Sequence, residues 1–377
     1  MKNMEDPSLK GGLFMNKKII IAVGGTGGHI YPALAVAEEL KKRCNELNVL
    51  FVGGELTKNP YMDQSLFSRL EISCGSLSWK KPMVSLINAG KIIKGVTGSY
   101  KILREFQPSL LLGFGSYHTL PMLLAAQQAE VPYILHEQNS VLGRVNRLLS
   151  KRAILTGVFF PEAARQVKGL AVEVGMPLRQ AYRKGSQSEE EAKNYFGLNI
   201  LKPVILMFGG SQGAQSLNQE FVRGVENTHC KNFSVLHFTG NSKATEEFKI
   251  RYERCGIAAC VKNFEHRMEL AWQTADLLVS RAGAGTIAEQ IEFEVPGILV
   301  PYPHAMDNHQ ETNADFMVNQ VGGAIKLSER EFAARNLVEE ALDMLNNKNV
   351  LTRKQSISEY KKLHKPQNFC SLILKFI

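Results

Sequence analysis

Two short glycine-rich segments, each between a strand-like run and a helix-like run, constrain the fold of this chain more than any other feature. The first, Gly24–His29 (GGTGGH), follows the apolar run Lys17–Val23. The second, Gly209–Ala214 (GGSQGA), follows Pro203–Phe208 in the same way. A strand that enters a helix through glycines is typical of parallel α/β sheets. Because the two units lie far apart in the 377-residue chain, we expect two similar α/β domains with a cleft between them.

The same alternation continues along the chain. A third strand–glycine–helix junction is expected at Ala275–Ser280, followed by Arg281–Thr286 (RAGAGT) and a helix from Ile287. The polar segment Gln180–Ala192 has no apolar stripe, which predicts a linker between the domains. Further strands are expected at Asn48–Val52, Leu110–Gly113, Tyr133–Leu135, Ala153–Thr156, Val172–Val174 and Gly297–Val300.

The composition indicates a globular protein with an anionic partner. Hydrophobic residues make up 44% and charged residues 21% of the chain, and 45 Lys and Arg against 36 Asp and Glu leave a net charge of +9. Aromatic residues rarely alternate with basic ones, so a nucleic acid partner is not expected. The chain has no uninterrupted run of 18 apolar residues, so a membrane-spanning helix is not expected. Six cysteines without a C-x-x-C pair favour reduced thiols in a cytosolic compartment.

The glycine segments favour phosphate binding. In such a loop the backbone amides and the positive end of the helix dipole point at one place, and glycine lets a phosphate come close. Tight strand–helix turns would explain any single loop equally well, but they explain all three less well. The P-loop pattern G-x-x-x-x-G-K-[ST] is absent, and Ile30 stands where a dinucleotide-binding loop needs its third glycine. Ordinary nucleotide hydrolysis and a dehydrogenase are therefore disfavoured.

Two other chemistries remain open at this stage. Gly209-x-Ser211-x-Gly213 matches the nucleophile elbow of serine hydrolases, and Asp276 and His304 or His309 follow in the required order. This hydrolase interpretation leaves the first glycine loop unexplained. His304, Asp307 and His309 resemble a metal cluster, although a polar loop after a strand accounts for them as well. The chain has no D-x-D motif, and neither a metal nor another cofactor is expected.

Taken together, the motifs resemble those of the bacterial MurG transferases. Besides the two glycine loops, the matching segments are His136–Asn139 (HEQN), Gly175–Arg179 (GMPLR) and Arg281–Glu289, with Gln310 and Asn313 beyond them. They occur in the family's order over roughly residues 16–345. Members of this family move N-acetylglucosamine from UDP-N-acetylglucosamine to a lipid-linked muramyl-pentapeptide (lipid I), which gives lipid II for peptidoglycan.

The resemblance implies an α/β fold of the GT-B type, with two Rossmann-like domains, parallel sheets and an inter-domain cleft. It also implies inversion at the anomeric carbon without a metal, and a last helix that returns to the first domain. The expected divisions are an extension at 1–15, an N-terminal acceptor and membrane-side domain at 16–180, a C-terminal UDP-sugar domain at 181–355 and a closing helix at 356–377.

The resemblance also implies which residues bind the donor. Arg179 would neutralise the leaving diphosphate, and Glu289 would accept hydrogen bonds from both ribose hydroxyls. Phe264 and Glu265 would lie at the uracil, and Gln310 would bind a sugar hydroxyl. The other residues expected around the donor are Thr26, Gly27, Gly28, Asn139, Gly210, Ser211, Gln212, Ala284, Gly285, Thr286, Ile287, Ala288 and Asn313.

An inverting transfer needs a base for the acceptor hydroxyl, and His29 is the first candidate because an imidazole titrates near neutral pH. Glu137 competes with it, and a histidine at a helix start is often structural. Two residues depart from the family: Met176 replaces the usual asparagine before proline, and His309 stands where a second glutamine is common. Gly115–Thr119 is a looser version of a family segment. These departures affect the expected sugar and acceptor contacts rather than the reaction class.

A mixed apolar and basic segment predicts contact with an anionic membrane surface. It contains Leu77, Trp79, Lys80 and Lys81, and apolar and basic residues continue to alternate after it. A buried amphipathic helix with a basic outer face would give the same pattern. With a lipid-borne acceptor, we expect a peripheral protein on the cytoplasmic face of the bacterial inner membrane. A UDP-sugar 2-epimerase of the same fold and a serine hydrolase that uses Ser211 remain as rival functions.

Overall fold

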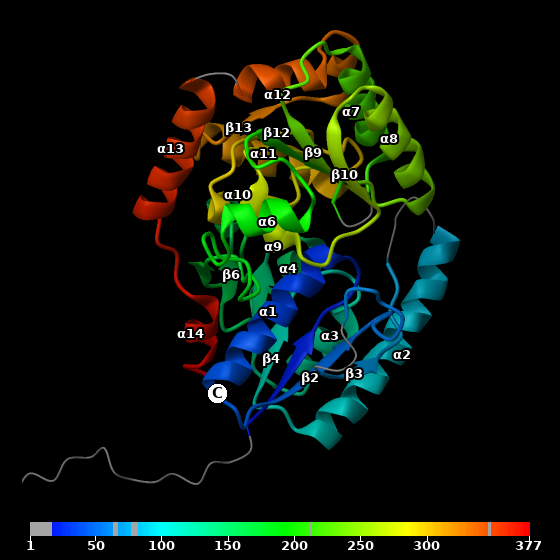
Figure 1. Ribbon diagram of the computed structural model, residues 1–377. Coiled ribbons are helices and arrows are strands. Elements are labelled where there is room, and N and C mark those ends of the chain that lie inside the picture. Colours follow the sequence, from blue (N-terminus) through cyan, green and yellow to red (C-terminus); the bar gives the residue numbers. More distant parts are fainter. Residues whose placement is uncertain (1–16, 63–66, 77–81, 211–212, 346–347) are drawn as a thin grey trace, which may run out of the picture.

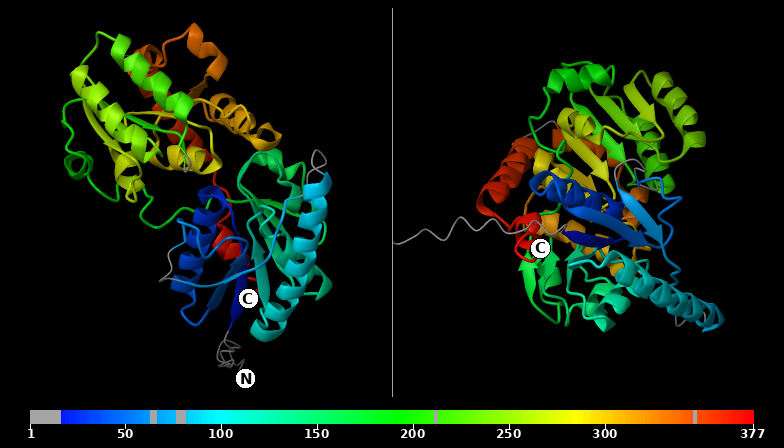
Figure 2. Two further views of the ribbon diagram at one scale, coloured as in Figure 1. Left: turned by 90° about the vertical axis from the view of Figure 1, so that its right-hand side faces the viewer. Right: turned by 90° about the horizontal axis from the view of Figure 1, so that it is seen from below.

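The computed structural model describes residues 17–62, 67–76, 82–210, 213–345 and 348–377 and contains two parallel sheets, one in each domain (Figure 1). The expected membrane residues Leu77–Lys81 and the loop residues Ser211 and Gln212 therefore lie outside the described residues. The α/β architecture expected from the sequence is confirmed. Figure 2 shows the two domains as separate lobes.

The N-terminal sheet has seven strands in the order β3-β2-β1-β4-β5-β6-β7. Helices α1 and α14 pack on one face and α2 and α3 on the other, so the central strands are buried and almost wholly apolar. The strands are β1 (Lys18–Ala22), β2 (Asn48–Gly53), β3 (Ser68–Glu71), β4 (Leu110–Gly113), β5 (Tyr133–Glu137), β6 (Thr156–Val158) and β7 (Ala171–Glu173). The helices are α1 (Gly27–Arg43), α2 (Pro82–Phe106), α3 (Leu120–Gln128), α4 (Arg144–Leu149) and α5 (Pro161–Ala164).

The C-terminal sheet has six strands in the order β10-β9-β8-β11-β12-β13. Its strands are β8 (Val204–Phe208), β9 (Ser234–Phe238), β10 (Ala258–Lys262), β11 (Leu277–Ser280), β12 (Gly297–Leu299) and β13 (Ala324–Lys326). Its helices are α6 (Glu189–Tyr195), α7 (Gln215–Asn227), α8 (Ser242–Arg254), α9 (Met268–Thr274), α10 (Ala284–Phe293), α11 (His309–Asn319), α12 (Leu337–Leu345) and α13 (Lys348–Leu363). Short 3-10 helices lie at Met306–Asn308 and Glu329–Ala333.

The end of the chain returns to the N-terminal domain. After α13, which packs on the C-terminal domain, Gln367 forms a parallel bridge with Val174, and α14 (Phe369–Ile373) follows. The side chain of Phe369 is buried against Gly157 on β6, where a Cβ would approach its ring to 2.8 Å. Four residues of α14 belong to the same apolar core as β1 and α1. The last residues of the chain therefore complete the core of the first domain.

Most of the expected strands are found, with small differences at their ends. The strand expected at Ala153–Thr156 is assigned to Thr156–Val158, although Ile154 already donates a backbone hydrogen bond to Tyr133. The segment expected as a linker consists of turns until Ser188, which caps α6 together with Glu191. The helix expected from Ile287 begins three residues earlier, at Ala284. Strands β3, β9, β10 and β13 were not predicted from the sequence.

Candidate active site

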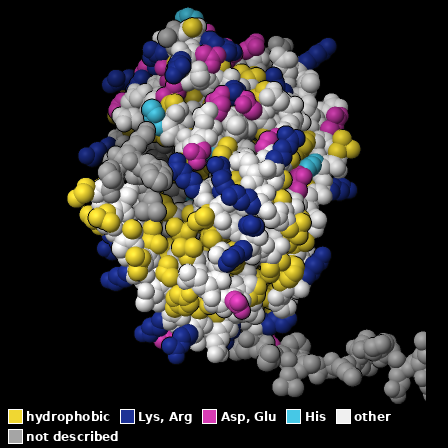
Figure 3. All heavy atoms as spheres, turned by 180° about the vertical axis from the view of Figure 1, so that it is seen from behind, with side chains coloured by type: hydrophobic (Ala, Val, Ile, Leu, Met, Phe, Trp, Pro, Cys, Tyr) yellow, Lys and Arg dark blue, Asp and Glu magenta, His cyan; other side chains and the backbone are white. Residues whose placement is uncertain are grey.

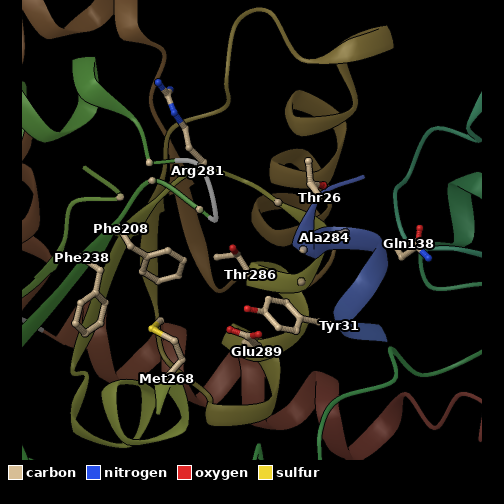
Figure 4. A pocket seen from close by; sticks show the side chains of 18 of the residues that line it. Thr26, Tyr31, Gln138, Phe208, Phe238, Met268, Arg281, Ala284, Thr286 and Glu289 are labelled. Atoms are coloured by element: carbon tan, nitrogen blue, oxygen red, sulfur yellow. The ribbon is translucent and has the colours of Figure 1, made fainter. Parts of the chain in front are cut away.

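A cleft of about 750 Å³ lies between the domains, where the carboxyl ends of both sheets meet. Both domains contribute to its walls (Figure 4). Most of the residues expected from the sequence border this cleft: Thr26, Gly27, Gly28, His29, Asn139, Arg179, Gly210, Phe264, Glu265, Ala284, Gly285, Thr286, Glu289 and Gln310. Four do not border it, namely Glu137, Ile287, Ala288 and Asn313. The side chains of Ile287 and Ala288 are instead buried in α10.

Three helices begin at the cleft with free amides. The residues that precede α1, α7 and α10 are Thr26, Ala214 and Gly283, and none of them forms a side-chain hydrogen bond to the helix. Among the described residues, the first two amides of each helix have no hydrogen-bond acceptor and can receive an anion, whereas the third amide of α1, from His29, donates to the Thr26 carbonyl. Gly213 has a φ of +72°, and a Cβ there would lie 2.7 Å from the Thr239 carbonyl, so this turn requires glycine.

Arg179 borders the cleft and contacts an aromatic ring of α1 in the N-terminal domain. Its Cζ lies 4.9 Å from the ring centre of Tyr31 on α1 and 4.7 Å from that of Tyr182. It also donates a 2.5 Å hydrogen bond to the Tyr182 hydroxyl. These contacts hold a positive charge at the cleft without neutralising it, which suits a group that receives an anion.

Glu289 places a carboxylate on the cleft wall, about one turn of α10 after the third glycine loop. Trp272 donates a 2.6 Å hydrogen bond to it from Nε1. Figure 4 shows the Tyr31 side chain pointing from α1 toward Glu289. Burial raises the pKa of Glu289 to about 7, although the Trp272 bond and the charge of Arg179 oppose this rise. Glu289 is therefore a hydrogen-bond acceptor whose charge changes near neutral pH.

His29 is half-buried in the first turn of α1 and borders the cleft. Its Nδ1 lies 3.1 Å from Oε1 of Gln138, in the loop after β5. Burial lowers the pKa of His29, while the charge of Glu137 and hydrogen bonds to Gln138 and the Phe114 backbone oppose this change. A neutral imidazole at neutral pH is the form that accepts a proton.

Glu137, the other candidate base, has a different environment. Its carboxylate accepts hydrogen bonds from Gly143 N and Asn146 Nδ2, both at 2.9 Å, and from Asn139 N at 3.1 Å. The side chain is only 2% exposed and lies behind the cleft wall. Through these three hydrogen bonds the Glu137 carboxylate holds the loop after β5 in place. The geometry therefore favours His29 as the base.

Asn313 joins the two domains. Its Oδ1 accepts hydrogen bonds from Ser140 N at 3.0 Å and from Ser140 Oγ at 2.7 Å. Its Nδ2 donates to the Ala282 carbonyl at 3.0 Å and to Asn139 Oδ1 at 3.4 Å. The side chain expected at the substrate is thus buried in a contact that brings the HEQN segment against the third glycine loop.

The geometry counts against the hydrolase and gives no support to a metal site. Asp276 exchanges hydrogen bonds with Val204, the first residue of β8, whereas the loop that contains Ser211 follows the last residue of that strand. Asp276 therefore lies at the wrong end of the sheet for a hydrolase triad with Ser211. Asp307 pairs with Arg144 at 3.5 Å. Within the described ranges, no three His, Cys, Asp or Glu side chains form a group that could hold a metal ion.

Several cleft residues were not singled out from the sequence. Tyr31 follows the GGTGGH motif closely, and Gln138 lies within HEQN but was given no role from the sequence. The buried guanidinium of Arg281 donates to Ser216 Oγ at 3.2 Å and to the Val300 carbonyl at 3.2 Å, and it pairs with Glu329. Arg281 thereby fixes the start of α7 beside β11. Met176 and His309, where the chain departs from the family, both border the cleft.

The comparisons with known proteins agree with this geometry. The glycosyltransferase family 28 N-terminal domain model matches residues 19–157, and the glycosyltransferase family 28 C-terminal domain model matches residues 204–367. The fold and the cleft are therefore those of a two-domain glycosyltransferase.

Three similar proteins show which family of glycosyltransferases the chain belongs to. The UDP-N-acetylglucosamine–N-acetylmuramyl-(pentapeptide) pyrophosphoryl-undecaprenol N-acetylglucosamine transferase of Protochlamydia amoebophila is 44% identical, over 96% of each chain. The protein of the same name from Chlamydia felis is 36% identical over 94% of this chain and 98% of its own. A crystal structure of Acinetobacter baumannii MurG has the same fold, with a TM-score of 0.73 at 24% identity over 96% of this chain and 99% of that one. The chain belongs to the MurG family.

Proposed function

We propose that this protein transfers N-acetylglucosamine from UDP-N-acetylglucosamine to the muramyl sugar of lipid I, giving lipid II in peptidoglycan synthesis. The name of the Protochlamydia amoebophila relative supports both substrates. The observation that carries the proposal is the cleft itself, where uncapped helix N-termini of the C-terminal domain face the half-buried His29 of the N-terminal domain.

The donor would lie along the C-terminal wall. The amides at the starts of α7 and α10, together with Ser211, would hold the diphosphate, and Arg179 would offset the charge that develops as UDP leaves. Glu289 would accept hydrogen bonds from the ribose hydroxyls, and the backbone around Phe264 would bind uracil. Gln310 would reach the sugar. Its side chain already accepts a 2.9 Å bond from Tyr302 N, which leaves its amide nitrogen free to donate.

The chemical step would begin at His29. Its Nε2 would take the proton from the acceptor hydroxyl while that oxygen forms a bond to the anomeric carbon. The bond from this carbon to the UDP oxygen would break on the opposite face, and UDP would leave with the electron pair. Attack opposite the leaving group inverts the anomeric configuration.

The proposal requires no metal ion for the leaving group. In many sugar transferases a D-x-D motif supplies metal ligands, and this chain has no such motif. Backbone amides at two helix starts and the Arg179 guanidinium offer a positive potential at the same place. Adding EDTA to an activity assay tests this point, and a loss of turnover that Mg²⁺ restores would contradict it.

We also propose that the protein acts at the cytoplasmic face of the bacterial inner membrane as a peripheral protein. On α2, Met83, Leu86, Ile87 and Ile93 are 63–75% exposed, and the side chains of Lys91, Lys94 and Lys101 are exposed on the same helix. Figure 3 shows hydrophobic side chains beside basic ones on one face of the molecule. None of the described helices is long and apolar enough to cross a membrane. Such a surface suits an anionic leaflet that presents lipid I.

A product assay separates this proposal from its rivals. The protein is incubated with labelled UDP-N-acetylglucosamine, with and without a lipid-linked muramyl-pentapeptide. Transfer of the label to the lipid only when the acceptor is present supports the proposal. An epimerised UDP-sugar formed without acceptor would indicate the epimerase, and labelling of Ser211 by a fluorophosphonate would indicate a hydrolase.

A further inference from the structure

The loop after β5 contains a buried amide that contacts two histidines. Gln138 is 2% exposed and lies between His29 on α1 and His136 on β5. Its Oε1 is 3.1 Å from His29 Nδ1, and its Nε2 is 3.1 Å from His136 Nδ1 and 3.3 Å from the Phe114 carbonyl oxygen. Neither the proposed mechanism nor the family motifs give Gln138 a role.

The contacts of Gln138 determine which way its amide points. The Phe114 carbonyl only accepts hydrogen bonds, so the Gln138 atom beside it must be the NH2 group. The same nitrogen also faces the lone pair of His136 Nδ1. The carbonyl oxygen of the amide is thereby directed at His29. Because this oxygen only accepts, His29 Nδ1 must carry the proton of that hydrogen bond.

His136 keeps the network neutral at its far end. The ring is fully buried, with centroids 5.4 Å from Phe114 and 4.8 Å from Phe369 on α14. Burial lowers the pKa of His136 to about 3, so the ring does not gain a proton at neutral pH. Its buried Nε2 has no hydrogen-bond partner among the described residues. The neutral His136 ring therefore accepts the hydrogen bond of the Gln138 amide at its Nδ1.

From this geometry we infer that Gln138 is a positioning residue, which holds His29 in the tautomer with its proton on Nδ1 and leaves the lone pair on Nε2. The inference rests on the proposed role of His29 as the base. In the other tautomer Nε2 would carry a proton and could not accept one from the acceptor hydroxyl. A second-partner hydrogen bond that sets the tautomer is a common way to prepare a catalytic imidazole.

The charges around His29 come from several elements. Glu137 on β5 raises the pKa of His29, whereas His309 on α11 and burial lower it. His118 after β4 and His136 on β5 also interact with it. Gln138 differs from all of these because it orients the ring without adding charge. Its replacement should therefore change the tautomer and the rate rather than the binding of UDP.

A long-range ¹H–¹⁵N correlation spectrum of histidine-labelled protein at pH 8 tests the inference directly. We expect His29 to show a protonated Nδ1 and an unprotonated Nε2. In Gln138→Met, which keeps the length of the side chain but removes its hydrogen bonds, we expect the Nε2-protonated form to appear. An Nε2-protonated His29 in the unmodified protein, or an unchanged tautomer in Gln138→Met, would overturn the inference.

Kinetics separate a positioning role from a structural one. We expect Gln138→Met to lower kcat by about 10- to 100-fold, with the Kd for UDP within twofold of the unmodified protein. Gln166→Met is the matched control, since Gln166 bonds Ser140 and Leu142 of the same loop but does not contact His29, and it should keep its kcat.

The two measurements fail in different ways. If Gln138→Met changes the tautomer but not kcat, His29 is not the base, and the proposed mechanism fails while the orientation of the ring stands. If Gln166→Met is as slow as Gln138→Met, the loss does not depend on contact with His29, Gln138 only supports the loop, and the inference is wrong.

Discussion

The two walls of the cleft offer different kinds of chemical group to a substrate. The C-terminal wall consists largely of glycine loops and helix starts, so its binding groups are backbone amides. The N-terminal wall depends on side chains in a buried hydrogen-bond network, with His29, Gln138 and Glu137 at its centre. A diphosphate is bulky and multiply charged, and several roughly aimed amides are enough to hold it. A proton must reach one ring nitrogen, which demands a fixed tautomer and orientation.

The largest effect should come from removing the base. We expect His29→Ala to lower kcat at least 100-fold, because a positioned general base contributes about that much or more. The Kd for UDP, measured by calorimetry, should change less than twofold because the amides of the other wall are intact. Near-normal turnover would show that His29 is not the base. The N-terminal wall would then have no side chain with an assigned chemical role.

Glu289, like Gln310, departs from the pattern of the C-terminal wall, since it would bind through a side chain. We expect Glu289→Ala to raise the donor KM about 10- to 100-fold, because hydrogen bonds to a charged group contribute about 1.5–3 kcal/mol each. Unaltered donor binding would discredit the ribose contact. Glu292→Ala, one turn later on α10, removes a carboxylate that pairs with Arg183 and Lys361 and does not border the cleft, and it serves as the control.

The raised pKa of Glu289 gives a second test of its contact with the donor. With a pKa of about 7, the fraction of carboxylate rises about tenfold between pH 6 and pH 8. Ribose hydroxyls donate to the carboxylate, so we expect the donor Kd to fall about tenfold over this range. In Glu289→Gln the donor Kd should be independent of pH. A donor Kd that falls equally in both proteins would assign the pH dependence to another group.

Asn313 tests whether the two walls act independently. Asn313→Ala removes the bonds to Ser140 and Ala282, each worth about 1 kcal/mol. We expect kcat/KM to fall about five- to tenfold and the melting temperature to drop. Asn319→Ala, at the exposed end of α11, should change neither quantity. A lower melting temperature with unchanged kcat/KM would show that the contact stabilises the molecule without aligning the walls.

The smallest expected effect concerns the outer surface of the N-terminal domain. Lys94→Gln should weaken binding to anionic vesicles about fivefold at low salt, because a basic residue near such a surface contributes about 1 kcal/mol. Lys249→Gln, on α8 of the other domain, is the control. Sedimentation with vesicles measures both. Equal binding of the two variants would remove α2 from the membrane contact.

Local sequence patterns predicted the C-terminal wall better than the N-terminal one. A glycine loop and the helix after it are neighbours in sequence, so their spacing predicted the strand–glycine–helix turns that border the cleft. The strands with weak patterns, such as the exposed edge strand β3, were missed because their burial depends on the sheet around them.

The side-chain network could not be read in the same way. His29 and Gln138 are 109 residues apart, and only the pairing of β1, β4 and β5 brings them together. The same holds for Asn313, which was expected at the substrate and instead contacts Ser140, 173 residues away. Such partners become visible only when the topology of the sheet is known.

The position of α14 has a consequence for how the molecule is made. A ribosome releases the first domain long before residues 369–373 emerge, yet those residues fill the core beside β1 and α1, and Phe369 touches His136. The core of the domain that is synthesised first is therefore completed only after residues 369–373 have been made. A substitution in α14, near the end of the sequence, therefore acts on the core of the half that was translated first.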